Sequence, residues 1–130
     1  MSEYLFSYGT LLPGRAPREV AGLVFKLRAL GEGTVRGILY DLRNYPGAVL
    51  GHVSGGKIFG MVFRLPKDPA VLRKLDDYEG FDGSAPGKSL FVRRPYPVML
   101  RGGQIRRWWV YEYNGKLVAA RVIADGRWQA

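Results

Sequence analysis

The 130-residue sequence contains no cysteine and a single histidine, His52. Without cysteine the chain can form no disulfide framework, offers no thiolate nucleophile and cannot bind zinc through thiolates. One histidine also argues against a metal site with several imidazole ligands. A dinucleotide or phosphate-loop fingerprint is missing too, since Gly31-Glu32-Gly33 matches neither. We therefore expect a protein that uses no metal ion and no cofactor.

Long apolar segments are also lacking. No apolar stretch follows Met1-Ser2-Glu3, as a secretion signal would require, and no later run approaches the length of a membrane span. A chain of this length suits one domain, and folding buries roughly two-thirds of the surface that the unfolded chain exposes. We expect one soluble, cytoplasmic domain over residues 1–130, with no membrane partner.

Acidic residues are scarce: 11 aspartates and glutamates face 20 lysines and arginines, which gives a net charge of +9. Such a charge fits a nucleic-acid or anionic partner, and equally a solvated basic surface. The basic residues extend along the whole chain, with one local excess of arginines at Arg93, Arg94, Arg101, Arg106 and Arg107. Charge alone does not distinguish these interpretations.

Apolar and β-branched runs between glycine and proline turns predict a protein rich in strands. The expected strands cover 3–8, 24–30, 34–42, 48–53, 57–65, 89–100, 104–113 and 116–123. Turns at Ser54-Gly55-Gly56, Gly102-Gly103 and Asn114-Gly115 predict three hairpins. A short helix is expected from Pro17 to about Leu23. The pattern predicts an α+β fold, a mostly antiparallel β barrel that carries one clear helix.

That clear helix is predicted over Asp68–Gly80. Asp68 can cap it, Pro69 fits the first helical position, and Gly80 can end it. At about 100° per residue, one face carries the apolar side chains. They are Val71, Leu72, Leu75 and Tyr78.

Glu79 falls within this apolar stripe, between Leu75 and Leu72. A carboxylate there loses hydration and lies at the negative end of the helix dipole. Both effects favour the protonated form and raise the pKa of Glu79 towards neutrality, as general acid/base chemistry at pH 7 requires. The alternative is that the last helical turn frays and Glu79 turns into water.

The loop Tyr8-Gly9-Thr10-Leu11 follows the first expected strand. Gly9 permits backbone angles that other residues avoid, so successive N–H groups could point outwards as an anion cradle. The plainer interpretation is a tight turn after a strand. The motif gains weight only together with Glu79.

Several short motifs, taken in order, resemble the gamma-glutamylcyclotransferase-like family. They are Tyr8–Leu11, Gly37–Leu42 followed by Tyr45-Pro46-Gly47, Leu75–Gly80, Phe91-Val92-Arg93 followed by Val98, and Trp109-Val110-Tyr111. The motif at Leu75–Gly80 is close to the form found in gamma-glutamylamine cyclotransferases. The chain departs from the family at Phe91, where tyrosine is frequent, and at Arg43-Asn44, where we expect a glycine nearby.

This resemblance implies a small mixed barrel with one clear and one short helix packed outside it, and a pocket at one mouth. It assigns Glu79 as the catalytic acid/base and gives the backbone N–H groups of Gly9, Thr10 and Leu11 to the gamma-glutamyl moiety. Other pocket candidates are Tyr8, Tyr40 and Tyr111. Arg93 could hold a carboxylate or brace a strand.

The implied enzyme releases an amine from a gamma-glutamyl amide and forms 5-oxoproline. Its nucleophile is the substrate's own alpha-amino nitrogen, which explains a site without cysteine, metal or serine triad. Intramolecular attack in a held geometry can supply roughly 7–11 kcal/mol of the barrier. The expected partner is thus a small gamma-glutamyl compound, and we expect a monomer or homodimer.

Two rival functions stay open. One is a cyclotransferase-like scaffold that binds gamma-glutamyl compounds without turnover. The other is a single-stranded nucleic-acid binder, for which Arg106-Arg107-Trp108-Trp109 offers charge and stacking rings. We expect no nucleic-acid partner, because Trp108 and Trp109 should point to opposite faces of a strand and be covered by packing.

Three further acidic residues could suggest a metal site, namely Asp76, Asp77 and Asp82. Their spacing matches no calcium loop. We interpret them as solvated helix and loop charges.

Overall fold

The computed structural model describes residues 3–9, 22–23, 26–51, 56–117 and 119–128. Gly22 and Leu23 are helical. The rest of the short helix predicted from Pro17 lies outside the described residues, as do Thr10, Leu11 and His52.

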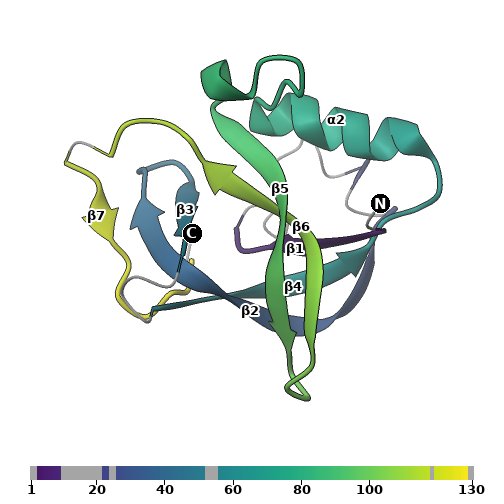
Figure 1. Ribbon diagram of the computed structural model, residues 1–130, viewed down its shortest axis with the longest axis horizontal. Coiled ribbons are helices and arrows are strands. Elements are labelled where there is room, and N and C mark those ends of the chain that lie inside the picture. The colour runs from purple at the N-terminus through teal and green to yellow at the C-terminus, as the bar shows by residue number, and fades with distance from the viewer. Residues whose placement is uncertain (1–2, 10–21, 24–25, 52–55, 118, 129–130) are drawn as a thin grey trace.

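Five strands close into a barrel through the pairings β2–β4–β1–β6–β5–β2 (Figure 1). The strands of the barrel are β1 (Tyr4–Ser7), β2 (Arg28–Asp41), β4 (Lys57–Arg64), β5 (Phe91–Leu100) and β6 (Ile105–Tyr113). β1 pairs with β6 in parallel, and the other strand pairs among the described residues are antiparallel. The expected α+β fold with a mixed, mostly antiparallel barrel is confirmed.

Strands β5 and β6 form the hairpin predicted at Gly102-Gly103. Their register runs from Phe91 opposite Tyr113 to Met99 opposite Ile105. The expectation for the two tryptophans agrees with this register. Trp108 packs against the barrel interior and Trp109 against the core beside the helix, so they occupy opposite faces of β6.

β2 is one long strand, whereas the sequence suggested two stretches separated at Gly31–Gly33. A bulge between Ala29 and Gly31 lets the strand continue. The first part of β2 pairs with β4, and the last part pairs with β3 (Pro46–Leu50). Among the described residues β3 pairs with β2 and not with β4, so the hairpin predicted around Ser54-Gly55-Gly56 is wrong. Ser54 and Gly55 themselves lie outside the described residues.

The hairpin predicted at Asn114-Gly115 is also wrong. The expected strand 116–123 shrinks to β7 (Arg121–Val122), which pairs with the end of β2. The Asn114 side-chain amide instead donates to backbone carbonyls at Pro86, Gly87 and Ser89. It thus fixes the short 3-10 helix η1 (Pro86–Lys88) that precedes β5.

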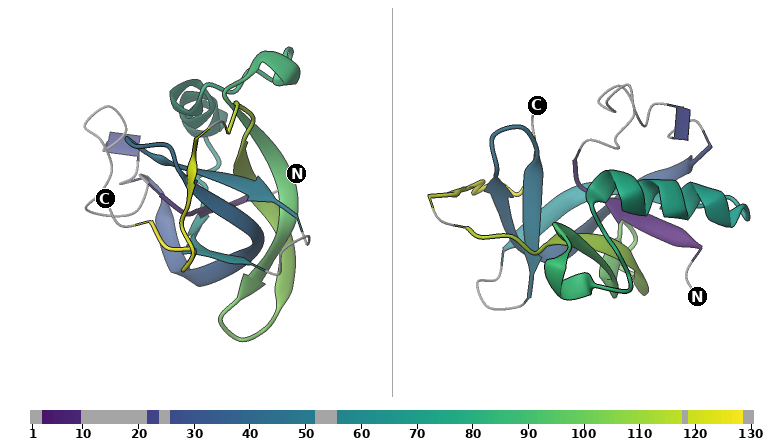
Figure 2. Two further views of the ribbon diagram at one scale, coloured as in Figure 1. Left: turned by 90° about the vertical axis from the view of Figure 1, so that its left-hand side faces the viewer. Right: turned by 90° about the horizontal axis from the view of Figure 1, so that it is seen from above.

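Helix α2 (Pro69–Glu79) has the ends that the sequence predicted. The Asp68 carboxylate accepts a hydrogen bond of 2.9 Å from the N–H of Ala70, and Pro69 follows at the first position. Gly80 adopts a left-handed conformation with φ 72°, which glycine reaches without a Cβ penalty. The helix lies across the outside of the barrel, above β1 and β5 in Figure 1 (see also Figure 2).

Alternating strand residues build two cores. Phe6, Val62 and Val110 join the cluster inside the barrel, whereas their neighbours Leu5, Phe63 and Tyr111 join a second cluster beneath α2. Val71 and Leu75 supply the helix's buried contribution to the second cluster. This arrangement presses the apolar stripe of α2 onto the barrel wall. Among the described residues, no helix has the length and apolar character of a membrane span.

Candidate active site

A cavity of about 230 Å³ opens beside the C-terminal end of α2. It is bounded by the end of β1, the start of β3, the last turn of α2 and the start of β5. Its described lining consists of Phe6, Ser7, Tyr8, Gly9, Tyr45, Pro46, Tyr78, Glu79, Leu90, Phe91 and Tyr111. Among these residues Glu79 is the one with a formal charge, and aromatic rings form most of the wall.

Glu79 is the last residue of α2 and lines this cavity. The residue is partly buried, and Leu75, one turn earlier, is packed into the core. Burial and, next, the negative charge of Asp76 raise the pKa of Glu79 to about 7. The carboxyl group can therefore accept or donate a proton near neutral pH. The predicted rise of this pKa and its predicted cause, loss of hydration, agree with this finding. The second cause is the charge of Asp76, where the helix dipole was expected.

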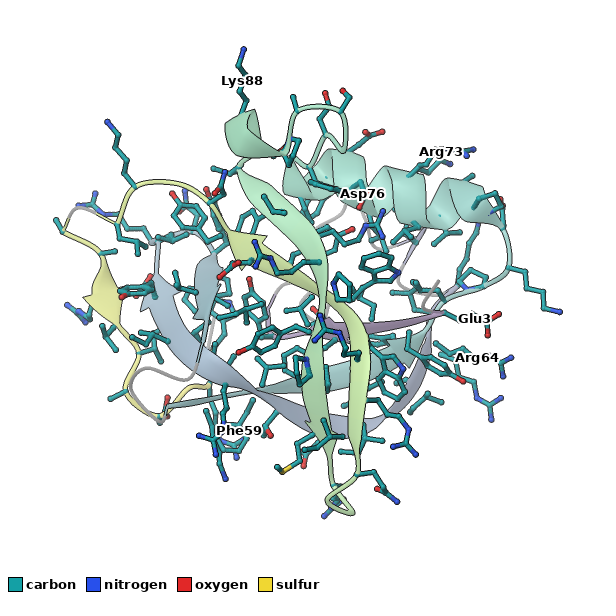
Figure 3. The ribbon with its side chains drawn as sticks, in the orientation of Figure 1. Glu3, Phe59, Arg64, Arg73, Asp76 and Lys88 are labelled. Atoms are coloured by element: carbon teal, nitrogen blue, oxygen red, sulfur yellow. The ribbon has the colours of Figure 1, made fainter. Side chains whose placement is uncertain are left out.

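Asp76 is held in place by two side chains from the barrel. Arg93 donates from Nε to Oδ1 at 2.8 Å and from Nη2 to Oδ2 at 3.1 Å. The Tyr111 hydroxyl donates to Oδ1 at 2.6 Å. Figure 3 shows Asp76 on α2, the helix that lies across the outside of the barrel. The interpretation of Asp76 as a solvated helix charge is therefore wrong. Its side chain is only 15% exposed, and both of its carboxylate oxygens accept hydrogen bonds.

Tyr8 lines the cavity. Its hydroxyl donates to the backbone carbonyl of Tyr111 at 2.5 Å and accepts from the N–H of Ala48 at 3.2 Å. Burial and the charge of Glu79 raise the pKa of Tyr8. Burial and the hydrogen bond to Asp76 likewise raise the pKa of Tyr111. Both phenols stay neutral near pH 7, so Glu79 is the group in the described lining that titrates there.

The structure brings together four of the residues singled out from the sequence, Tyr8, Gly9, Glu79 and Tyr111, around one cavity. It places two others elsewhere. Tyr40 pairs with Gly47 and Val122 in the sheet and does not line the cavity. Arg93 lies outside the lining as well, and the carboxylate that it holds is Asp76 of the same chain.

Sequence reasoning did not assign the aromatic wall of the cavity. Tyr45, Tyr78, Leu90 and Phe91 line it, and the Tyr45 and Phe91 rings lie 5.9 Å apart. Two of these residues stand in motifs that the sequence analysis had singled out, Tyr45 in Tyr45-Pro46-Gly47 and Phe91 in Phe91-Val92-Arg93. Those motifs could have pointed to them as residues of the cavity. Within the described part of the chain, no three acidic or histidine side chains are grouped so that they could hold a metal ion.

Comparison with known proteins places the chain in a sequence family. The model of the family described as "Gamma-glutamyl cyclotransferase, AIG2-like" matches residues 5–130. A comparison with curated proteins found no match.

Solved structures share the fold. Protein ytfP from Escherichia coli is 25% identical, with a TM-score of 0.65 over 96% of this chain and 95% of that one. An AIG2-like protein from Mus musculus is 22% identical, with a TM-score of 0.68 over 88% and 79% of the two chains. A structure titled gamma-glutamyl cyclotransferase is 16% identical, with a TM-score of 0.64 over 94% and 70%.

Proposed function

The chain belongs to the gamma-glutamyl cyclotransferase, AIG2-like family, and on that premise we propose that it converts a gamma-glutamyl amide into 5-oxoproline and a free amine, with Glu79 as the acid/base. The observation that carries the proposal is the Glu79 carboxyl group, which lines an aromatic cavity beside Tyr8 and Gly9 and has a pKa of about 7.

The reaction needs no protein nucleophile. The alpha-amino nitrogen of the substrate attacks its own gamma-carbonyl carbon, and the bond from that carbon to the amide nitrogen breaks. One proton moves from the attacking nitrogen to Glu79 and then from Glu79 to the leaving nitrogen, so Glu79 ends the cycle as it began. A carboxyl group with a pKa near neutrality suits both transfers. No water is consumed, and an enclosed site serves this chemistry by excluding hydrolysis.

The cavity supplies positioning. Tyr8 and Tyr111 are held by their own hydrogen bonds, so their rings form fixed walls against which the glutamyl chain folds into a near-cyclic shape. The backbone at Gly9 lines the same cavity, where an N–H group can hold the alpha-carboxylate or the developing oxyanion. A cavity of about 230 Å³ suits a small acyl group rather than a large ligand.

A substrate pair tests the chemistry. A gamma-glutamyl anilide with a free alpha-amino group should yield 5-oxoproline and aniline in equal amounts, measured by mass spectrometry. The matched N-acetylated anilide keeps the scissile bond but blocks the nucleophile, so it should give no aniline. Aniline release from the acetylated compound would show hydrolysis and refute the intramolecular route. Binding of both compounds without any product would indicate the non-catalytic scaffold instead.

A further inference from the structure

Arg93 is unusually constrained for a charged residue outside the cavity. Its guanidinium group makes two hydrogen bonds to the Asp76 carboxylate, and its side chain is 16% exposed. The guanidinium carbon lies 4.1 Å from the centroid of the Trp109 ring and 5.6 Å from that of Phe81. A planar guanidinium that is both paired and stacked has one orientation available to it.

Asp76 transmits this constraint to the cavity. It precedes Glu79 by three positions, so the two carboxyl groups lie on neighbouring positions of one helix face. The same Oδ1 atom that Arg93 binds also accepts the hydrogen bond from Tyr111. The position of Asp76 therefore affects both the ionisation of Glu79 and the orientation of the Tyr111 side chain.

We propose that Arg93 and Asp76 are a positioning pair for the acid/base Glu79, an assignment that rests on the proposed function. Arg93 holds the Asp76 carboxylate in one place. Asp76 then presents a fixed negative charge towards Glu79 and anchors the Tyr111 ring. Neither residue belongs to the described lining of the cavity.

The charges that face Glu79 explain why the pair matters. Asp76 on α2 is the charged neighbour that raises the pKa of Glu79, in addition to burial. Tyr8, which directly follows β1, and Tyr111 from β6 are neutral phenols. Arg93 from β5 reaches the site through Asp76, whose charge it partly offsets. The ionisation of Glu79 therefore depends on the balance within this pair.

Removing either partner breaks the same ion pair, yet the two changes should act in opposite directions on Glu79. Asp76→Asn removes the repelling carboxylate and leaves the arginine cation, so Glu79 should ionise at lower pH. Arg93→Met leaves Asp76 uncompensated, so Glu79 should ionise at higher pH. An ion pair that only braced the helix would give two variants with similar losses and an unmoved titration.

The experiment is a titration of the Glu79 carboxyl carbon by ¹³C NMR, with Glu79→Gln to assign the resonance. We expect its midpoint to fall by about one pH unit in Asp76→Asn and to rise in Arg93→Met. Arg93→Lys keeps the charge and should return the midpoint towards wild type. The matched controls are Asp77→Asn and Arg73→Met, which remove exposed charges from α2 and should leave the midpoint in place.

Midpoints that coincide in wild type and Asp76→Asn, or that move in the same direction in Asp76→Asn and Arg93→Met, would overturn the proposal. If Arg93→Met does not fold, Asp76→Asn and Arg93→Lys still decide it: the first must shift and the second must stay near wild type. The low-pH limb of kcat/KM should follow the same shifts. Because the NMR titration needs no turnover, an inactive protein with shifted midpoints would refute the proposed function and leave the positioning pair intact.

Discussion

The Tyr8 hydroxyl donates a hydrogen bond to the backbone carbonyl of Tyr111 across 103 positions of the chain. Tyr8 directly follows β1, Tyr111 belongs to β6, which runs parallel to β1, and both residues line the cavity. This bond connects Tyr8 to Tyr111, whose own hydroxyl group donates to Asp76. The hydrogen bond therefore ties the loop that begins at Tyr8 to a strand of the barrel.

Tyr8→Phe should destabilise the protein by about 1–3 kcal/mol. The substitution leaves the Tyr111 carbonyl and the Ala48 N–H without their buried partner, which costs more than the bond itself contributes. Urea denaturation should show a lower midpoint and an unchanged slope. Tyr40→Phe, outside the cavity, is the matched control and should stay within about 0.5 kcal/mol of wild type. Equal urea midpoints for Tyr8→Phe and Tyr40→Phe would contradict a stabilising role for the two hydrogen bonds of the Tyr8 hydroxyl group.

The sequence was sufficient to predict local features of the fold, such as helix ends and one hairpin. It was not sufficient to predict which strand each of β3 and β7 pairs with. α2 was correct because its cap, first-turn proline and terminal glycine are adjacent signals. The β5–β6 hairpin was correct for the same reason. The two wrong hairpins assumed that neighbouring strands pair, whereas β3 and β7 both pair with β2. Partner choice depends on the closed barrel, which no short window of sequence contains.

The candidate site divides in the same way. Glu79 was identifiable because its position on the helix face can be counted along the chain. Asp76 was misread because the groups that hold it come from 17 and 35 positions away. Arg93 left two interpretations open until the identity of its carboxylate partner was known.

Glu79→Gln should make the folded protein more stable at neutral and alkaline pH. The pKa of Glu79 in the folded protein is about 7, above its usual 4.5, so the stability that it contributes is complete below pH 4.5 and is lost as pH rises through 7. The advantage of the variant should grow between those values and then level off at about 3 kcal/mol. Urea denaturation of both proteins from pH 4 to 8.5 measures it. A difference that stays flat with pH would contradict a raised pKa.

Gly60→Ala should destabilise the protein by about 2 kcal/mol or more. A Cβ atom at Gly60 would collide with the Ser7 carbonyl oxygen and lie 2.8 Å from Cζ of Phe6, so β4 could not keep its place beside β1. Gly87→Ala is the matched control, because a Cβ there meets no atom within 4 Å. Thermal unfolding compares the two. A Gly60→Ala protein as stable as Gly87→Ala would show that β1 and β4 can separate without cost.

The role of Glu79 is tested most directly by the rate of 5-oxoproline formation from a gamma-glutamyl anilide in wild type and Glu79→Gln at pH 7.5. The variant keeps the shape of the side chain but cannot carry the proton, so kcat should fall by roughly two or more orders of magnitude. Circular dichroism and the stability gain described above would establish that it folds. Turnover of the folded Glu79→Gln protein at the wild-type rate would contradict the assignment of Glu79 as the acid/base.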